Sequence, residues 1–190
     1  MTHMLKGFGV VIGMALVLYL GWAQYKEFLT RGQKPPEGTQ ILNKMEKEGA
    51  PDFSIQDLKG QTVTLSEFKN KIVIVNFWAS WCEPCVKEFP SLIQLLKQFP
   101  EDLVLLAISA DYTLEDLNGF TKAFGVEKVP NFIVMWDKDQ KVAEKYGTAV
   151  LPESYIIGKN LKLIRKVAGV EDWDSAMAQE FFKQVIQDFK

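Results

Sequence analysis

The stretch that decides the fold is residues 76–90, which read NFWASWCEPCVKEFP. It contains both cysteines of the chain, Cys82 and Cys85, with two residues between them. It overlaps the β-branched run KIVIVNFWA, which is typical of a strand buried on both faces. After it, apolar residues recur at helical spacing as far as Phe99. The sequence therefore places two thiols where a buried strand passes into a helix.

This position predicts redox chemistry. The unpaired N–H groups and the dipole of a helix N-terminus stabilise a thiolate at Cys82. Pro84 falls in the first turn, where its missing N–H costs no hydrogen bond. Because Cys85 lies three residues after Cys82 on the same helical face, a disulfide can close with little backbone movement. We expect Cys82 to be the exposed, attacking thiol and Cys85 the shielded, resolving thiol.

Two other roles for the cysteines are a zinc site and an inert core pair. A structural zinc site takes four ligands, usually Cys and His. His3 is the only histidine and precedes an apolar run, so we expect no metal site within one chain. An inert pair of core cysteines is the other alternative, but the corner between a strand and a helix is usually exposed, which favours the redox role.

Length and charge limit the class of protein. The chain has 190 residues, of which 47% are hydrophobic, and this suits one folded domain with additional segments. Its net charge of −2 offers no basic excess for binding nucleic acid. With two cysteines, the chain is also not a small disulfide-stapled domain.

The N-terminal region predicts a membrane segment. Residues 7–25 carry no charge, and this length is close to the ~20 residues that a spanning helix needs. We expect residues 1–25 to form an uncleaved anchor, or else a signal peptide cut after Ala23. Residues 26–49 are polar with Pro35 and Pro36, which predicts a linker holding a short helical piece at 41–47. The folded domain is then residues 50–190.

The remaining pattern is that of an α/β domain. Residues 52–65 read as a β-hairpin, residues 103–109 as a buried strand and residues 114–124 as a helix. Three more strands are expected at 131–136, 153–158 and 162–169, and an amphipathic helix at 172–189. A strand–helix–strand connection within one sheet should be parallel and right-handed.

The segment FWASWCEPCVKEFP resembles the active-site segment of the thioredoxin superfamily. It is most similar to the membrane-tethered, extracytoplasmic TlpA/ResA-like thiol-disulfide oxidoreductases, and the resemblance covers residues 50–190. It implies a thioredoxin fold, with a central mixed β-sheet flanked by helices, an N-terminal β-hairpin and a helix-and-strand insertion at residues 111–146. One N-terminal transmembrane helix would precede this domain.

The resemblance also implies roles for residues at the dithiol. Cys82 would be the nucleophile that forms a mixed disulfide, and Cys85 would resolve it. The segment AVLPESYII resembles the loop whose cis-proline faces the dithiol, so Pro152 would be cis and the backbone of Leu151 would pair with an incoming peptide. From the residues alone, Pro130 is an equally good candidate for a cis bond.

Two glutamates flank the resolving thiol. By the resemblance, Glu88 would exchange a proton with Cys85, while a solvated helix glutamate is the other reading. Glu83 would place a negative charge beside Cys82 and favour reducing character. Asn76 stands where thioredoxin has an aspartate, as in the TlpA/ResA-like group, so proton transfer would run through Glu88 or water. Trp81, together with Glu83 and Pro84, would shape the surface around the sulfurs.

The function implied is thiol-disulfide exchange in which the Cys82–Cys85 disulfide is the redox group and no other cofactor takes part. The resemblance points to reduction of disulfides in extracytoplasmic proteins, including apocytochrome c during cytochrome c maturation. A membrane thiol carrier would donate the electrons, and the chain would act as a monomer in the cytoplasmic membrane with its domain on the periplasmic or outer side. A thiol peroxidase, a dithiol oxidase and a non-catalytic binding module are the alternatives. Residues 111–119 and 145–154 would carry substrate specificity.

Overall fold

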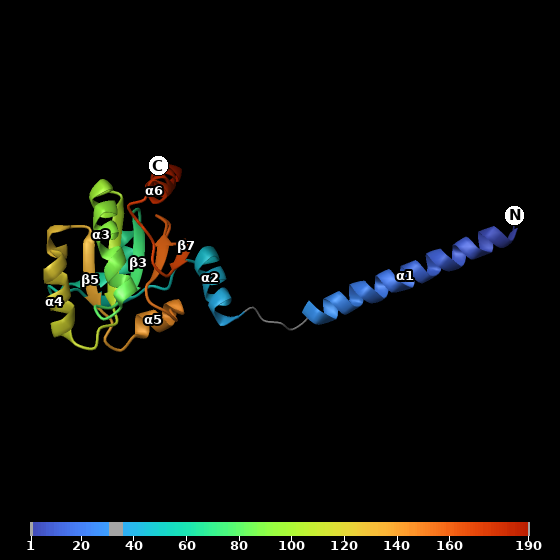
Figure 1. Ribbon diagram of the computed structural model, residues 1–190, viewed down its shortest axis with the longest axis horizontal. Helices are drawn as coiled ribbons and strands as arrows, with labels where there is room; N and C mark the ends of the chain where they lie inside the picture. Colours follow the sequence, from blue (N-terminus) through green and yellow to red (C-terminus); the bar gives the residue numbers. More distant parts are fainter. Residues whose placement is uncertain (1, 31–35, 190) are drawn as a thin grey trace. The chain divides into compact units, whose positions relative to one another are not determined.

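The computed structural model describes residues 2–30 and 36–189, and the chain divides into two units, Met1–Glu37 and Gly38–Lys190. The first unit holds helix α1 (Thr2–Thr30), which contains most of the predicted anchor (Figure 1). Across residues 2–30 and 36–189, no helix combines the length and the apolar character that crossing a membrane requires. The anchor stays a prediction, and residues 31–35 of the predicted linker lie outside the described residues.

The second unit is built on a mixed five-stranded sheet with the strand order β5-β4-β3-β6-β7. Strands β3, β4 and β5 run parallel to one another, whereas β6 is antiparallel to both of its neighbours, β3 and β7. Their bounds are β3 (Ile72–Trp78), β4 (Leu103–Ser109), β5 (Phe132–Trp136), β6 (Glu153–Ile157) and β7 (Leu163–Ala168). A separate hairpin pairs β1 (Ser54–Gln56) with β2 (Thr62–Thr64). The predicted thioredoxin-like sheet and hairpin are confirmed.

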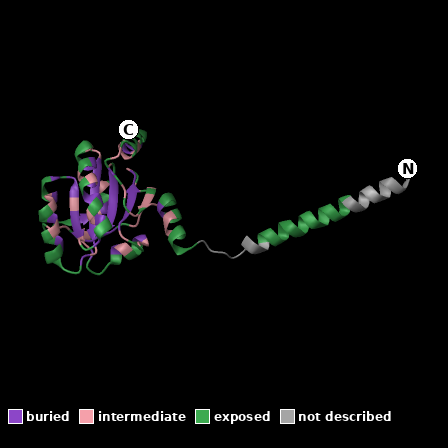
Figure 2. Ribbon diagram, viewed as in Figure 1, coloured by how far each residue is buried: buried purple, intermediate pink, exposed green. Residues whose placement is uncertain are grey.

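Helices cover both faces of this sheet. Their bounds are α2 (Glu37–Lys47), α3 (Glu83–Gln98), α4 (Leu114–Phe124), α5 (Lys141–Tyr146) and α6 (Ala176–Asp188), with short 3₁₀ turns η1 (Leu65–Phe68) and η2 (Val126–Lys128). Strands β3, β4 and β6 are buried along their whole length, while the outer helix faces are exposed (Figure 2). Buried side chains from α3, α4 and α6 fill one core, and those from α2 and α5 fill the other.

Strand β3 explains how one segment serves both cores. All seven of its residues are buried. Because side chains alternate along a strand, Ile74 and Trp78 pack into the core beneath α3, while Val75 and Phe77 pack into the opposite core. Asn76 therefore faces α3, the helix that begins with the cysteine motif.

Helix α2 lies in the range predicted as a linker. Met45 on this helix is 1% exposed and packs into the core that also contains Phe77 and Tyr146. The short helical piece predicted at 41–47 is confirmed, but the polar composition of residues 26–49 did not predict that this helix packs against the core. In the structure the compact unit begins at Gly38.

Met45→Ala is expected to lower the free energy of unfolding by about 2–5 kcal/mol, because it leaves a cavity in this core. Urea denaturation of the full chain measures the change. The matched control is Glu46→Ala, an exposed neighbour on the same helix, which should stay within about 0.5 kcal/mol of wild type. Equal free energies of unfolding for the two variants would mean that the packing of α2 does not stabilise the domain.

Candidate active site

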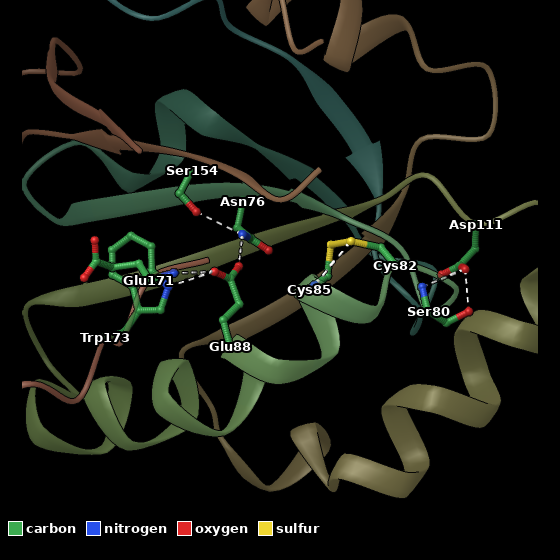
Figure 3. Close-up of a disulfide and its surroundings, with 9 residues drawn as sticks. All are labelled: Asn76, Ser80, Cys82, Cys85, Glu88, Asp111, Ser154, Glu171 and Trp173. Carbon is green, nitrogen blue, oxygen red and sulfur yellow. Dashed lines mark hydrogen bonds between the residues drawn. A yellow bond between two sulfur atoms is a disulfide. The ribbon is translucent and has the colours of Figure 1, made fainter. Parts of the chain in front are cut away.

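The two cysteines form a disulfide at the N-terminus of α3, with 5.2 Å between their Cα atoms (Figure 3). Cys82 is the N-cap residue, and its Sγ accepts a hydrogen bond of 3.2 Å from the backbone N–H of Cys85. Cys82 is 6% exposed and Cys85 is fully buried, so only Cys82 offers surface to a substrate. Pro84 lies in the first turn, as the sequence indicated.

A pocket of about 550 Å³ opens beside Cys82. Its walls come from the cysteine motif, from the ends of β3 and β4, from α5 and from the segment that precedes β6. Among the residues that line it are Trp81, Cys82, Glu83, Pro84, Tyr112 and Leu151. The pocket is thus open to a polypeptide segment that brings a disulfide to Cys82.

The peptide bond between Leu151 and Pro152 is cis, as the resemblance implied. Leu151 lines the pocket next to Cys82, while Pro152 is buried. Pro130, the other candidate from sequence, lies in a different pocket beside β5. The structure therefore brings Leu151 together with the cysteine motif and leaves Pro130 away from it.

Trp81 forms an exposed aromatic pair with Tyr112 at the rim of the pocket. The two rings are stacked, with centroids 5.6 Å apart and planes 15° apart. Trp81 is 53% exposed and Tyr112 is 74% exposed, so the pair offers apolar surface to solvent. The sequence predicted that residues 111–119 carry specificity but did not single out Tyr112 within them. The available signal was that the carboxyl ends of neighbouring parallel strands meet at one edge of a sheet.

The same edge holds a buried aspartate, Asp111, at the start of the predicted specificity segment 111–119, and its hydrogen bonds were not predicted. One carboxylate oxygen of Asp111 accepts hydrogen bonds from the backbone N–H of Ser80 at 2.9 Å and from its hydroxyl at 2.6 Å. The other oxygen accepts from the Ser109 hydroxyl at 2.7 Å. Ser80 stands two residues before Cys82, so Asp111 ties the end of β4 to the loop that carries the nucleophile.

Asp111→Ala is expected to cost about 2–4 kcal/mol of unfolding free energy, because it leaves the three donors on Ser80 and Ser109 without an acceptor. Urea denaturation checks this value. The control is Asp116→Ala, which removes an exposed carboxylate that accepts from the Thr113 hydroxyl and should cost less than about 1 kcal/mol. A loss no larger than that of the control would contradict the role given to Asp111.

Glu88 lies one turn after Cys85 and is 1% exposed, so it is not a solvated helix glutamate. Its carboxylate accepts from the amide of Asn76 at 3.1 Å, and from the indole N–H of Trp173 and the backbone N–H of Glu171 at 3.4 Å each (Figure 3). Burial raises the pKa of Glu88 to about 7, although these three hydrogen bonds oppose the shift. The group can therefore change protonation near neutral pH.

The partners of Glu88 come from distant parts of the chain. Asn76 also donates to the hydroxyl of Ser154 at 2.9 Å, which links β3 to β6. Trp173 precedes α6 and lies 85 positions from Glu88. No local pattern could predict this partner, whereas Asn76 had been singled out because it replaces an aspartate.

Glu83 occupies the first turn of α3 and is exposed. It forms an ion pair of 2.8 Å with Lys87, four residues later. The hydrogen bond and charge of Lys87 lower the pKa of Glu83, so its carboxylate is ionised beside Cys82. Among the described residues, no three His, Cys, Asp or Glu side chains gather as metal ligands.

Comparisons with known proteins agree with this geometry. Residues 47–166 match the AhpC/TSA family. The thiol-disulfide oxidoreductase ResA of Bacillus thuringiensis subsp. konkukian is 31% identical over 94% of this chain and 95% of its own length. ResA of Bacillus subtilis is 31% identical over 82% of this chain and 80% of its own length.

Solved structures show the same fold. A thiol:disulfide interchange protein from Bacteroides sp. superposes with a TM-score of 0.59 at 29% identity, covering 72% of this chain and 88% of its own. The thioredoxin domain of a thiol-disulfide oxidoreductase from Bacteroides vulgatus gives a TM-score of 0.58 at 29% identity, covering 73% and 96%. The chain therefore belongs to the AhpC/TSA family and is a thioredoxin-like thiol-disulfide oxidoreductase similar to ResA.

Proposed function

We propose that this oxidoreductase reduces disulfides in polypeptide segments outside the cytoplasm, including the haem-attachment cysteines of apocytochrome c. The observation that carries the proposal is the pocket that is lined by Cys82, by the exposed Trp81–Tyr112 pair and by Leu151. The aromatic rings supply apolar contact area, and the backbone at Leu151 can pair with an extended peptide. A substrate loop can thus present a disulfide directly to the Cys82 sulfur.

The proposed reaction transfers two electrons from the dithiol to the substrate. The Cys82 thiolate attacks one sulfur of the substrate disulfide, forms a mixed disulfide and releases the first substrate thiolate. Cys85 then loses its proton and attacks the Cys82 sulfur. This step releases the second substrate thiolate and forms the Cys82–Cys85 disulfide, while each released thiolate takes up a proton from solvent.

Glu88 is the proposed acceptor of the Cys85 proton. It lies one turn along α3 from Cys85, and its pKa of about 7 lets it accept or release a proton near neutral pH. Asn76 donates to the carboxylate and has no acidic proton of its own, so it orients Glu88. The hydrogen bonds from Trp173 and Glu171 hold the same carboxylate from the side of α6.

The location and the electron source are part of the proposal. The uncharged run at residues 7–25 supports an N-terminal membrane tether or a secretion signal. Substrate disulfides persist in oxidising compartments, which supports an extracytoplasmic domain in the cytoplasmic membrane. Electrons would arrive by exchange with a membrane thiol carrier.

The test is the rate at which the reduced full chain reacts with a disulfide peptide that carries a Cys-X-X-Cys-His sequence. We expect a second-order rate constant at least about tenfold above that for oxidised glutathione, because peptide contacts worth about 1.4 kcal/mol add to the exchange step. The control peptide has alanine in place of the histidine and separates general peptide recognition from recognition of the haem-attachment sequence. Equal rates with the peptides and with glutathione would contradict the proposal.

A further inference from the structure

A second buried polar network lies on the face of the sheet opposite Glu88. Along β6, Ser154 faces Asn76, whereas Glu153 and Tyr155 face the core that contains α5. Glu153 is buried and directly follows the cis-proline Pro152. The active-site loop therefore leads straight into a charged residue inside the core.

Glu153 is held by an ion pair and by a hydroxyl group. Its carboxylate lies 2.9 Å from the ammonium of Lys166 on β7. It also accepts a hydrogen bond of 3.1 Å from the hydroxyl of Tyr155. The Lys166 ammonium stands 5.1 Å from the centre of the Tyr155 ring. All three side chains are thus in mutual contact.

Glu153 and Tyr155 stabilise the charged form of Lys166. Partial burial alone would lower the pKa of Lys166, but the hydrogen bonds and charges of Glu153 and Tyr155 outweigh it and raise that pKa. Buried ion pairs add little net stability compared with apolar residues of the same volume. What the pair supplies is a fixed geometry for the hydroxyl of Tyr155.

The Tyr155 hydroxyl reaches both ends of the segment that lines the pocket. It donates to the backbone oxygen of Tyr146 at 2.9 Å as well as to Glu153, so its single proton is shared between two acceptors. It also lies 3.4 Å from the hydroxyl of Thr148. Tyr146 precedes the segment and Glu153 follows it.

The segment between these two ends is the pocket wall. Residues 148–151 all line the pocket beside Cys82. The backbone N–H of Thr148 also bonds to the oxygen of Ala143 at 3.0 Å, which ties the segment to the end of α5. The hydroxyl of Tyr155 thus joins Tyr146 and Glu153, the residues on either side of this wall, and we call this arrangement the clamp.

We propose that Tyr155, held by the Glu153–Lys166 pair, is a positioning residue that fixes residues 148–151 for pairing with a polypeptide substrate. The inference rests on the proposed function, because it takes this wall as the surface that binds the peptide. Tyr155 touches neither sulfur and acts through the wall. It therefore sets the KM for peptides and not the reactivity of Cys82.

The test compares Tyr155→Phe with Tyr146→Phe in the full chain. Tyr146 is a matched control because its ring packs against Tyr155 with 5.1 Å between centroids, but its hydroxyl donates to Pro51, away from the pocket wall. Tyr155→Phe should raise the KM for the Cys-X-X-Cys-His disulfide peptide about tenfold, because it removes the hydrogen bonds of the Tyr155 hydroxyl to Tyr146 and Glu153. The rate of Tyr155→Phe with dipyridyl disulfide should stay within about twofold of the wild-type rate. The rates of Tyr146→Phe with the peptide and with dipyridyl disulfide should also stay within about twofold of wild type.

Amide hydrogen exchange of residues 148–151 provides a readout that needs no substrate. It should be about tenfold faster in Tyr155→Phe than in wild type or Tyr146→Phe. Unchanged exchange, or equal losses with the peptide and dipyridyl disulfide, would overturn the positioning role. If exchange rises as expected while wild type reduces the peptide no faster than glutathione, the clamp stands and the proposed peptide substrate fails.

Discussion

Cys82→Ser should lower the rate of disulfide reduction by at least roughly a thousandfold, the scale of loss when a covalent nucleophile is removed. The reason is access: Cys82 lines the pocket, whereas Cys85 is fully buried and cannot replace it. Serine at position 82 keeps the shape of the side chain but lacks a thiolate that can attack a disulfide.

Cys85→Ser is the matched variant, because it removes the same disulfide from the resting protein. It should still attack and then stop at a mixed disulfide between Cys82 and the substrate. Mass spectrometry after incubation with the disulfide peptide measures the adduct. An adduct on Cys82→Ser, or continued turnover of Cys85→Ser, would reverse the assignment of attacking and resolving thiols.

Glu88→Gln should slow the resolution step by about 10²-fold, the lower end of what a positioned proton acceptor contributes. Glutamine keeps the size of the side chain but cannot take the Cys85 proton. The wild-type rate should also rise through a pKa of about 7, and this limb should vanish in the variant. Stopped-flow measurement of mixed-disulfide decay between pH 5 and pH 9, about two units on either side of the expected transition, checks both effects.

The same group makes stability depend on pH in a direction that follows from its pKa. The pKa of Glu88 is about 7 in the folded chain and has its ordinary value of 4.5 in the unfolded chain, so the folded state holds the proton more tightly. Wild-type stability should therefore fall as pH rises from about 4.5 to 7, by roughly 3 kcal/mol for the whole shift. Glu88→Gln should lack this decline.

Glu171→Gln is the control for both measurements. It removes a nearby carboxylate whose charge raises the Glu88 pKa slightly, while it keeps the backbone N–H that donates to Glu88. Its pH profiles should follow those of wild type closely. A pH-independent difference in stability between wild type and Glu88→Gln would contradict a raised pKa at Glu88.

The parts of the fold that sequence predicted are those with strong local patterns. The buried run of β3, the helical spacing of α3 and the position of Cys82 between them are visible within residues 71–99. Helix α2 was only partly anticipated, because the burial of Met45 depends on a core assembled from distant segments. Polar composition alone cannot reveal that contact.

The candidate site divides in the same way. Glu88 was predictable because it stands three residues after Cys85 on one helix. Its partner Trp173 was not, since a contact across 85 positions leaves no trace in a local pattern. For Asp111 and Tyr112 the location was predictable but the contacts were not. Both follow a strand that is parallel to β3, and they therefore reach the same edge of the sheet as the cysteine motif.

The most direct test of the proposed reducing role is the reduction potential of the Cys82–Cys85 couple in the full chain, measured by equilibration with glutathione and dithiothreitol buffers. The ionised Glu83 beside Cys82 disfavours the thiolate, and we expect a value near about −270 mV, as in thioredoxin. A value near about −120 mV would identify a dithiol oxidase and contradict the proposed direction. Failure to form a disulfide in any buffer would instead leave the binding module as the function of this fold.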